Sequence, residues 1–82
     1  MILSAEVTLY PLQDDYLPVI KAFLARLADT AQVKFETFPT CTVLTGDYQQ
    51  VLDTLGEMMR WSQETHGKGV FVVKFLPGYE AL

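Results

Sequence analysis

The chain has 82 residues, half of them apolar, and a formal net charge of -4. This length predicts one domain, residues 1–82, with a thin core. Six Lys plus Arg without a basic run make nucleic acid or an anionic membrane surface a poor partner. A single Cys and a single His exclude an internal disulfide and a zinc cluster. No apolar run reaches membrane-spanning length, and "MILSAEVTLY" does not read as a secretion signal, so we expect a cytoplasmic protein.

The first third of the chain predicts a strand followed by a helix. Met1 to Leu9 alternates apolar and polar residues, which is typical of a half-buried strand, and Pro11 ends it. A helix is expected from Asp15 to about Thr30, capped by Asp14 or Asp15, with Pro18 in its first turn. Its predicted core stripe consists of Leu17, Ile20, Leu24, Leu27 and Ala28. Two apolar residues off this stripe, Val19 and Phe23, suggest a second contact.

The rest of the chain predicts a hairpin, a second helix and a last strand. Val33 to Phe38 and Thr40 to Thr45 read as strands joined by a short turn. Asp47 is a plausible cap for a helix that runs to about Thr65. The stripe of this helix is Val51, Leu52, Leu55, Met58 and Met59. Gly67 and Gly69 then lead into the strand "VFVVKFL", which ends at Pro77-Gly78.

The element order β-α-β-β-α-β predicts an α+β, ferredoxin-like fold, with both helices on one face of a four-stranded antiparallel sheet. The first and third strands should lie side by side in its middle. We expect these residues to point at the helices: Leu3, Val7, Cys41, Val43, Phe71, Val73 and Phe75. The opposite, open face should carry Glu6, Thr8, Tyr10, Thr40, Thr42, Leu44, Val70, Val72 and Lys74. That mixture of apolar and polar residues suits a subunit contact or a ligand surface.

No group of residues in the sequence indicates an enzyme. Cys41 reads as a buried thiol, and His66 as a helix-end residue. With one histidine, no Ser/His/Asp or Cys/His arrangement can be assembled. Glu6, inside the first strand, reads either as an ion-pair partner of Lys74 or as an acceptor for a ligand amine. The acids, hydroxyls and aromatic rings together suit a flat, hydrogen-bonding ligand.

Three segments resemble the YkoF-like thiamin/hydroxymethylpyrimidine-binding family. They are "SAEVTLYPLQDDYLPVI" (Ser4 to Ile20), "TCTVLTGDYQQVLDTL" (Thr40 to Leu55) and "GVFVVKFLPG" (Gly69 to Gly78). The resemblance implies a ferredoxin-like fold that binds thiamin or its pyrimidine moiety without catalysis and without a cofactor. YkoF itself looks like two such domains in tandem. A homodimer of this chain would replace that pair, with a tetramer as the alternative.

The resemblance also implies ligand contacts. Thr8 and Tyr10 match the strand-one motif, and Asp14, Asp15 and Tyr16 match the acidic pair and the aromatic residue after it. Thr42 matches a Ser or Thr of strand three, and Gly46 the glycine of the following turn. Gly46 is expected on the same side of the domain as the acids. Glu6 is kept as a further ligand contact.

Two functions from different classes remain open at this stage. The first is a carrier or buffer of thiamin or hydroxymethylpyrimidine in uptake or salvage. The absence of a basic phosphate clamp argues against phosphorylated forms of either ligand. The second is a structural or regulatory homo-oligomeric module without a thiamin-related ligand.

Overall fold

The structure is a computed structural model that describes residues 1–82. In chain order the elements are β1 (Ile2–Pro11), α1 (Leu17–Thr30), β2 (Lys34–Phe38), β3 (Cys41–Asp47), α2 (Tyr48–His66) and β4 (Gly69–Pro77). The predicted order and type of all six elements are therefore confirmed. None of the helices is long and apolar enough to cross a lipid bilayer.

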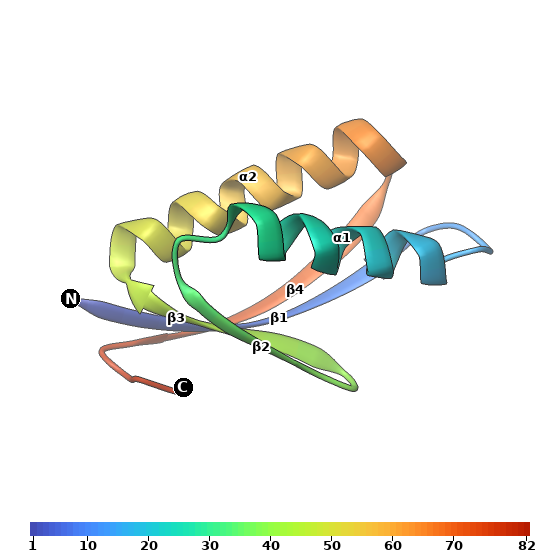
Figure 1. Cartoon of the computed structure of the whole chain (residues 1–82). Helices are drawn as coiled ribbons and strands as arrows, with labels where there is room; N and C mark the ends of the chain where they lie inside the picture. Colours follow the sequence, from blue (N-terminus) through green and yellow to red (C-terminus); the bar gives the residue numbers. More distant parts are fainter.

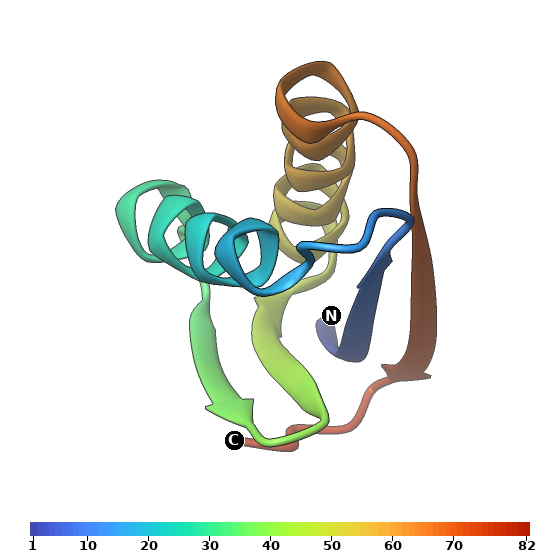
Figure 2. The same cartoon turned by 90° about the vertical axis from the view of Figure 1, so that its right-hand side faces the viewer.

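The four strands form one antiparallel sheet in the order β2-β3-β1-β4. Both helices lie on the same face of this sheet (Figures 1 and 2). β1 and β3 are side by side in the middle, and β2 and β4 are the two edge strands. The predicted ferredoxin-like fold is confirmed.

The core lies between the sheet and the helices. On β1, Leu3, Ala5, Val7 and Leu9 are buried, as strict alternation requires for the face under the helices. The cross-strand partners of Ala5, Val7 and Leu9 on β4 are Phe75, Val73 and Phe71, so the predicted facing of β4 is also correct. Pairwise burial of this kind is the main stabilising contribution in so small a domain.

The predicted facing of β3 is wrong. Val7 pairs with Thr42 and Ala5 with Leu44, so Thr42 and Leu44 point at the helices and are buried. Cys41 and Val43 lie on the open face and are half-buried. The reason is the tight hairpin: Phe38 pairs with Cys41 across the turn, and this register fixes the direction of every later β3 side chain.

The predicted orientation of α1 is wrong in part: Leu27 of the predicted stripe is buried, but the buried face is centred on Val19 and Phe23. The buried residues are Val19, Phe23 and Leu27, while Leu17 and Ala28 are exposed. Ile20 and Leu24 are only partly buried against the core. The helix is apolar over a wide arc, and the side that faces the sheet is the one that carries Phe23, which packs against Phe71 with ring centroids 5.8 Å apart.

The caps of the two helices differ. Tyr16 occupies the cap position of α1 and makes no side-chain cap hydrogen bond, so the predicted cap by Asp14 or Asp15 is wrong. Pro18 sits in the first turn, as predicted, and offers no amide hydrogen to a capping carboxylate. For α2 the prediction is confirmed, because the Asp47 carboxylate accepts hydrogen bonds from the amides of Gln49 and Gln50. On the α2 stripe, Met58 is buried but Met59 is exposed.

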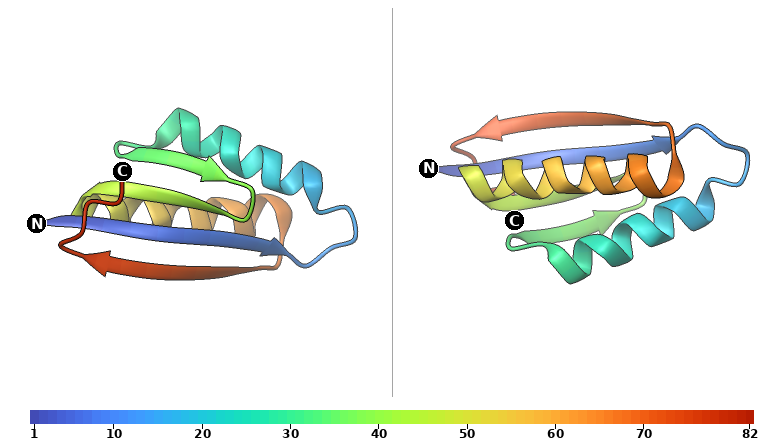
Figure 3. Two further views of the ribbon diagram at one scale, coloured as in Figure 1. Left: turned by 90° about the horizontal axis from the view of Figure 1, so that it is seen from below. Right: turned by 90° about the horizontal axis from the view of Figure 1, so that it is seen from above.

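The chain after β4 folds back across the open face of the sheet (Figure 3). The Ser4 hydroxyl donates to the carbonyl oxygen of Tyr79 and accepts from the amide of Ala81 at 2.9 Å. The Ser4 and Thr45 hydroxyls are 2.8 Å apart, and both side chains are buried. The tail therefore covers one end of the open face and leaves the end near Tyr10 uncovered.

Candidate functional site

The central strand β1 continues past the end of its neighbour β3. The β1–β3 pairing stops at Val7 and Thr42, whereas the β1–β4 pairing continues to Pro11 and Gly69. The segment from Thr8 to Pro11 therefore has a strand partner on one side only. Opposite the unpaired side stands the turn of the β2–β3 hairpin, which leaves a notch at this end of the sheet.

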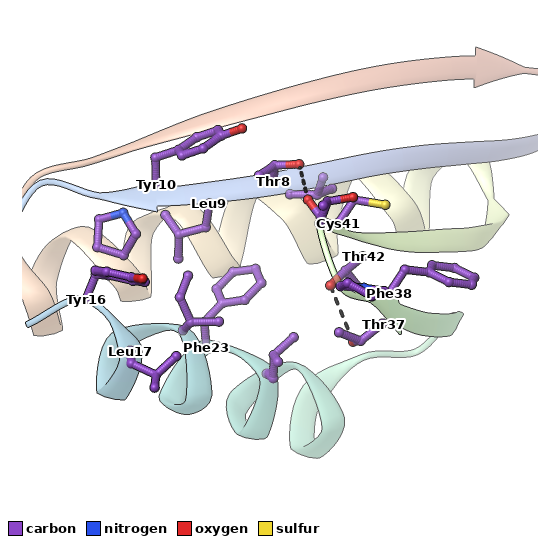
Figure 4. A pocket seen from close by; sticks show the side chains of 16 residues that line it. Thr8, Leu9, Tyr10, Tyr16, Leu17, Phe23, Thr37, Phe38, Cys41 and Thr42 are labelled. Atoms are coloured by element: carbon purple, nitrogen blue, oxygen red, sulfur yellow. Dashed lines mark hydrogen bonds between the residues drawn. The ribbon is translucent and has the colours of Figure 1, made fainter.

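This notch opens into a groove of about 560 Å³ between the end of β1, the first half of α1 and the hairpin. In Figure 4 Tyr10 and Tyr16 stand on one side of it, and Phe38, Thr42 and Thr37 stand on the other. The lining residues are Val7, Thr8, Leu9, Tyr10, Pro11, Tyr16, Leu17, Ile20, Phe23, Leu24, Thr37, Phe38, Pro39, Thr40, Cys41 and Thr42. This volume lies within the range of small-molecule sites.

The lining of the groove is uncharged. It contains four aromatic rings and six hydroxyl groups, and no Asp, Glu, Lys, Arg or His. The Thr37 and Thr42 hydroxyls are 3.4 Å apart, and the Thr8 hydroxyl donates to the carbonyl oxygen of Thr40 at 3.0 Å. A threonine hydroxyl can donate one hydrogen bond and accept two, so these groups can still accept from a ligand. The groove can hold a flat, largely apolar molecule with a few polar edges.

The floor and one wall of the groove come from α1. Leu17, Ile20 and Leu24 line it, and Phe23 contributes to both the groove and the core. These three aliphatic residues belong to the five-residue stripe that the sequence pattern assigned to the core, and two of them, Ile20 and Leu24, also pack against the core. The wide apolar arc of α1 therefore serves two surfaces: one side packs on the sheet, and the other faces the groove.

The groove brings together four of the eight predicted site residues, namely Thr8, Tyr10, Tyr16 and Thr42. Asp14 and Asp15 do not line it: they are exposed in the loop before Tyr16. That loop is tied to the start of β4 by a hydrogen bond from the Leu12 amide to the Lys68 carbonyl oxygen, directly after the pairing of Pro11 with Gly69. The two acids therefore lie outside the groove, next to the tyrosine that forms one of its walls.

Glu6 and Gly46 lie outside the groove. Glu6 is on the open face with its carboxylate 3.9 Å from the Lys74 ammonium, which is the ion pair that the sequence allowed as one reading. Gly46 pairs with Leu3, at the opposite end of β1 from the acids. Its predicted placement beside them is wrong because β3 runs antiparallel to β1, so the two strands end on opposite sides of the domain.

The sequence reasoning missed the hairpin wall of the groove. Phe38, Pro39, Thr40 and Cys41 all line it, and Cys41 is half-buried at this surface rather than enclosed in the core. The available signal was the difference in strand length. A ten-residue first strand cannot be matched along its whole length by the seven-residue β3, so a gap has to follow at one end.

His66 and the carboxylates do not form a second site. His66 ends α2, as predicted, and packs edge-on against Trp61 with ring centroids 5.3 Å apart. The guanidinium of Arg26 lies over the same indole, 5.6 Å from its centroid. No three His, Cys, Asp or Glu side chains come together in a way that could hold a metal ion.

The fold and the groove define a small ferredoxin-like domain with a ligand-sized, uncharged groove at one end of its sheet. The sequence profile of the YKOF-related Family matches residues 2–75, which is nearly the whole chain. The chain belongs to this family. No curated protein matches the chain.

Solved structures share this fold at low sequence identity. A Streptococcus pneumoniae protein superposes with a TM-score of 0.86 at 23% identity, over 96% of this chain and 89% of that one. A candidate thiamine biosynthesis/salvage protein from Thermotoga maritima gives 0.82 at 19% identity, over 99% and 86% of the two chains. A hypothetical protein from Methanocaldococcus gives 0.78 at 22%, over 95% and 81%. At these identities the similarity shows the fold alone.

Proposed function

We propose that this chain binds thiamin or its hydroxymethylpyrimidine moiety in the groove and acts as a non-enzymatic carrier or buffer in thiamin uptake or salvage in the cytoplasm. Membership of the YKOF-related Family and the thiamine-related description of the Thermotoga protein support a thiamin-related function. The observation that carries the choice of site is the groove itself. It has the size, the aromatic rings and the hydroxyls that a substituted pyrimidine requires.

The uncharged lining favours the pyrimidine as the part that enters. An aminopyrimidine is flat and neutral, and its amine can donate to the Thr42 and Thr37 hydroxyls while a tyrosine ring packs against its face. A charged group inside the groove would lose hydration without a counter-ion. The positively charged ring of thiamin therefore belongs at the mouth, where Asp14 and Asp15 precede Tyr16. The phosphate of a phosphorylated form should add no affinity, because no basic side chain lines the groove.

Titration calorimetry with hydroxymethylpyrimidine, thiamin and thiamin diphosphate tests this proposal. We expect the first two ligands to bind and the diphosphate to bind more weakly. Thr42→Val keeps the shape of the buried side chain and removes its hydroxyl. It should weaken binding roughly tenfold, the effect of one lost buried hydrogen bond. Thr54→Val, at a buried threonine of α2 outside the groove, is the matched control and should leave affinity unchanged.

Absence of heat and of any thermal shift with all three ligands at millimolar concentration would contradict the proposal. Equal losses of affinity for Thr42→Val and Thr54→Val would show that the valine acts through stability rather than through contact. Turnover of a ligand into a product would contradict the non-enzymatic part. That part rests on the lining, which offers hydroxyls and one thiol but no proton-transfer pair.

A second candidate function is assembly through the open face, without a thiamin-related ligand. The specific observation in its favour is that Tyr10 and Val72 are 55% and 52% exposed on the part of this face that the tail leaves uncovered. We propose that this face joins two copies in a homodimer. Val43→Lys places a charge in the middle of the face, between Glu6 and Glu36, its partners on the neighbouring strands. A dimer that survives this change, measured by sedimentation, does not use the face.

A further inference from the structure

The backbone groups of β1 are shared between its two neighbours in a fixed alternation. In an antiparallel sheet, successive residues of a strand direct their N–H and C=O groups to opposite sides. The Leu12 amide donates to the Lys68 carbonyl next to β4, whereas the Met1 carbonyl accepts from the Tyr48 amide next to β3. Both bonds continue the registers of the two pairings. Even-numbered residues of β1 therefore bond to β4, and odd-numbered residues direct their backbone groups to the β3 side.

Leu9 is an odd-numbered residue that has lost its partner on that side. The β1–β3 pairing ends at Val7 and Thr42, so the next partner in this register is Thr40. No backbone hydrogen bond joins Leu9 to Thr40, and the Thr40 carbonyl accepts from the Thr8 hydroxyl at 3.0 Å instead. The N–H and the C=O of Leu9 are therefore left without a strand partner, although Leu9 is only 8% exposed.

These two backbone groups belong to the wall of the groove. Leu9 lines it, and Figure 4 shows the Leu9 side chain on the same side of β1 as Phe23 and α1. The backbone edge of the strand therefore faces the notch, across from the hairpin turn. Nearly all buried backbone N–H and C=O groups in folded proteins have a hydrogen-bond partner. A donor and an acceptor left over at a ligand-sized groove are thus candidates for pairing with its occupant.

The pattern of these groups matches one edge of an aminopyrimidine. A residue in an extended strand offers its N–H and its C=O side by side, as it does to a neighbouring strand. On an aminopyrimidine, the amine is a donor and the adjacent ring nitrogen is an acceptor. The amine can donate to the Leu9 carbonyl while the ring nitrogen accepts from the Leu9 amide. The second N–H of the amine stays available for a hydroxyl of the lining.

The unpaired edge is too short for the strand of a partner protein. Pro11, the next odd-numbered residue, has no N–H, and Val7 is already paired with Thr42. An extended peptide finds a free donor at a single residue, whereas a flat heterocycle needs no more than one donor and one acceptor. The groove of about 560 Å³ also suits one small ring system.

We propose that the backbone N–H and C=O of Leu9 recognise the amine and the adjacent ring nitrogen of an aminopyrimidine, and that this main-chain pair determines the specificity of the groove. The inference rests on the proposed function and names the groups that select the ligand. In the analogue with an oxo group in place of the amine, donor and acceptor exchange places along the edge. Donor then meets donor and acceptor meets acceptor, a mismatch that a buried site rejects strongly. Because the pair is main chain, side-chain substitutions in the groove leave this preference in place.

Amide hydrogen exchange, measured by NMR on the unmodified chain, tests the pairing directly. Ala5 is the reference, because it lies on the same strand and is paired with Leu44 of β3. In the free protein the Leu9 amide should exchange faster than the Ala5 amide. Saturating hydroxymethylpyrimidine should slow exchange at Leu9 by at least about tenfold more than at Ala5, where only the general stabilisation by a bound ligand acts. The oxo analogue should bind at least roughly a hundredfold more weakly.

The outcomes separate this inference from the proposed function. If hydroxymethylpyrimidine binds without added protection of Leu9, or if the oxo analogue binds equally well, the main-chain recognition is wrong and the proposed function stands. If hydroxymethylpyrimidine does not bind at all, both are wrong.

An ester in place of one amide tests the donor alone. Chemical ligation of the 82-residue chain allows leucic acid at position 9, which keeps the leucine side chain and replaces its N–H by an oxygen atom. Affinity for hydroxymethylpyrimidine should fall roughly tenfold, the effect of one lost hydrogen bond. The midpoint of urea unfolding should hardly change, because the N–H has no strand partner in the free chain.

The matched control is lactic acid at position 5, which removes the N–H of Ala5 on the same side of the same strand. Because Ala5 is paired with Leu44 and lies outside the groove, this ester should lower the unfolding midpoint and leave affinity unchanged. Two results would overturn the inference: an ester at position 9 that lowers the midpoint as much as the one at position 5, or one that leaves affinity as it is.

Discussion

The Thr8 hydroxyl donates to the carbonyl oxygen of Thr40 across 3.0 Å, at the point where β1 loses β3 as a neighbour. This side-chain bond follows directly after the last backbone pairing between the two strands. It holds the hairpin turn against β1, and so it sets the width of the notch from which the groove opens (Figure 4). Four residues within two positions of Thr8 or Thr40 line the same groove, namely Tyr10, Phe38, Cys41 and Thr42.

Replacing Thr8 by valine should loosen this end of the sheet. The substitution keeps the β-branched shape and removes the donor, so the cost in unfolding free energy should be about 0.5–1.5 kcal/mol, the net value of one hydrogen bond. Amide hydrogen exchange should become faster in the hairpin turn and not at the Ser4 end of the sheet. Unchanged exchange at Thr40 and Cys41 would show that the turn is held by other contacts.

Removing a carboxylate should lower the free energy of unfolding at the start of α2 and leave it nearly unchanged at the start of α1. Asp47→Ala removes a cap that bonds two amides of α2, and it should cost about 1 kcal/mol of unfolding free energy. Asp15→Ala removes an exposed acid that caps nothing, and stability should stay within about 0.5 kcal/mol. Chemical denaturation of both variants measures the difference. A cost for Asp15→Ala as large as that for Asp47→Ala would mean that the acid caps α1 after all.

Ser4→Ala should release the tail. The hydroxyl bonds Thr45, Tyr79 and Ala81 at once, so its loss leaves buried polar groups without a partner and should cost about 1–3 kcal/mol. The tail amides should exchange faster, and carboxypeptidase should trim the chain more quickly. Ser62→Ala, a buried serine on α2, is the control and should leave the tail as it is.

Substitution by alanine should change the stability of the protein in opposite directions at two glycines, Gly46 and Gly56. A Cβ atom at Gly46 would stand 2.7 Å from Cγ1 of Val33, a stiff side chain that is half-buried. Gly46→Ala should therefore cost about 1–3 kcal/mol. Gly56 lies exposed in α2 with open space around the added atom, and Gly56→Ala should stabilise the protein by about 0.5–1 kcal/mol. Melting temperatures that move in the same direction would contradict this pair.

Alternation along β1 predicted its facing because one of its faces is distinctly apolar. On β4 both faces are largely apolar, and Lys74 marks the face that points away from the helices. β3 carries no such signal, since Thr42, Val43 and Leu44 suit either face of a strand. Its direction is set by the pairing of Phe38 with Cys41 across the turn. The facing of β3 depends on which residues pair across the turn, and the amino-acid composition of the strand does not reveal that pairing.

The site was only half predictable for a related reason. The apolar arc of α1 is wider than one interface needs, and the pattern could not tell which side faces the sheet. Packing of Phe23 on Phe71 decides it, and that contact joins residues far apart in the chain. Asp14 and Asp15 were assigned to the site because they match the family's motif, but they are exposed in the loop before Tyr16 and neither lines the groove.

The unequal lengths of β1 and β3 have a consequence for how the groove of such a domain can change. One wall of the groove is a hairpin turn whose residues Pro39 and Thr40 are exposed and belong to no strand. Insertions, deletions or substitutions in that turn alter the size and chemistry of the groove, while the buried residues of β1, α1 and α2 keep their contacts. If the groove binds a ligand as we propose, ligand choice and folding are therefore separable traits in this chain, and selection can act on the first with little risk to the second.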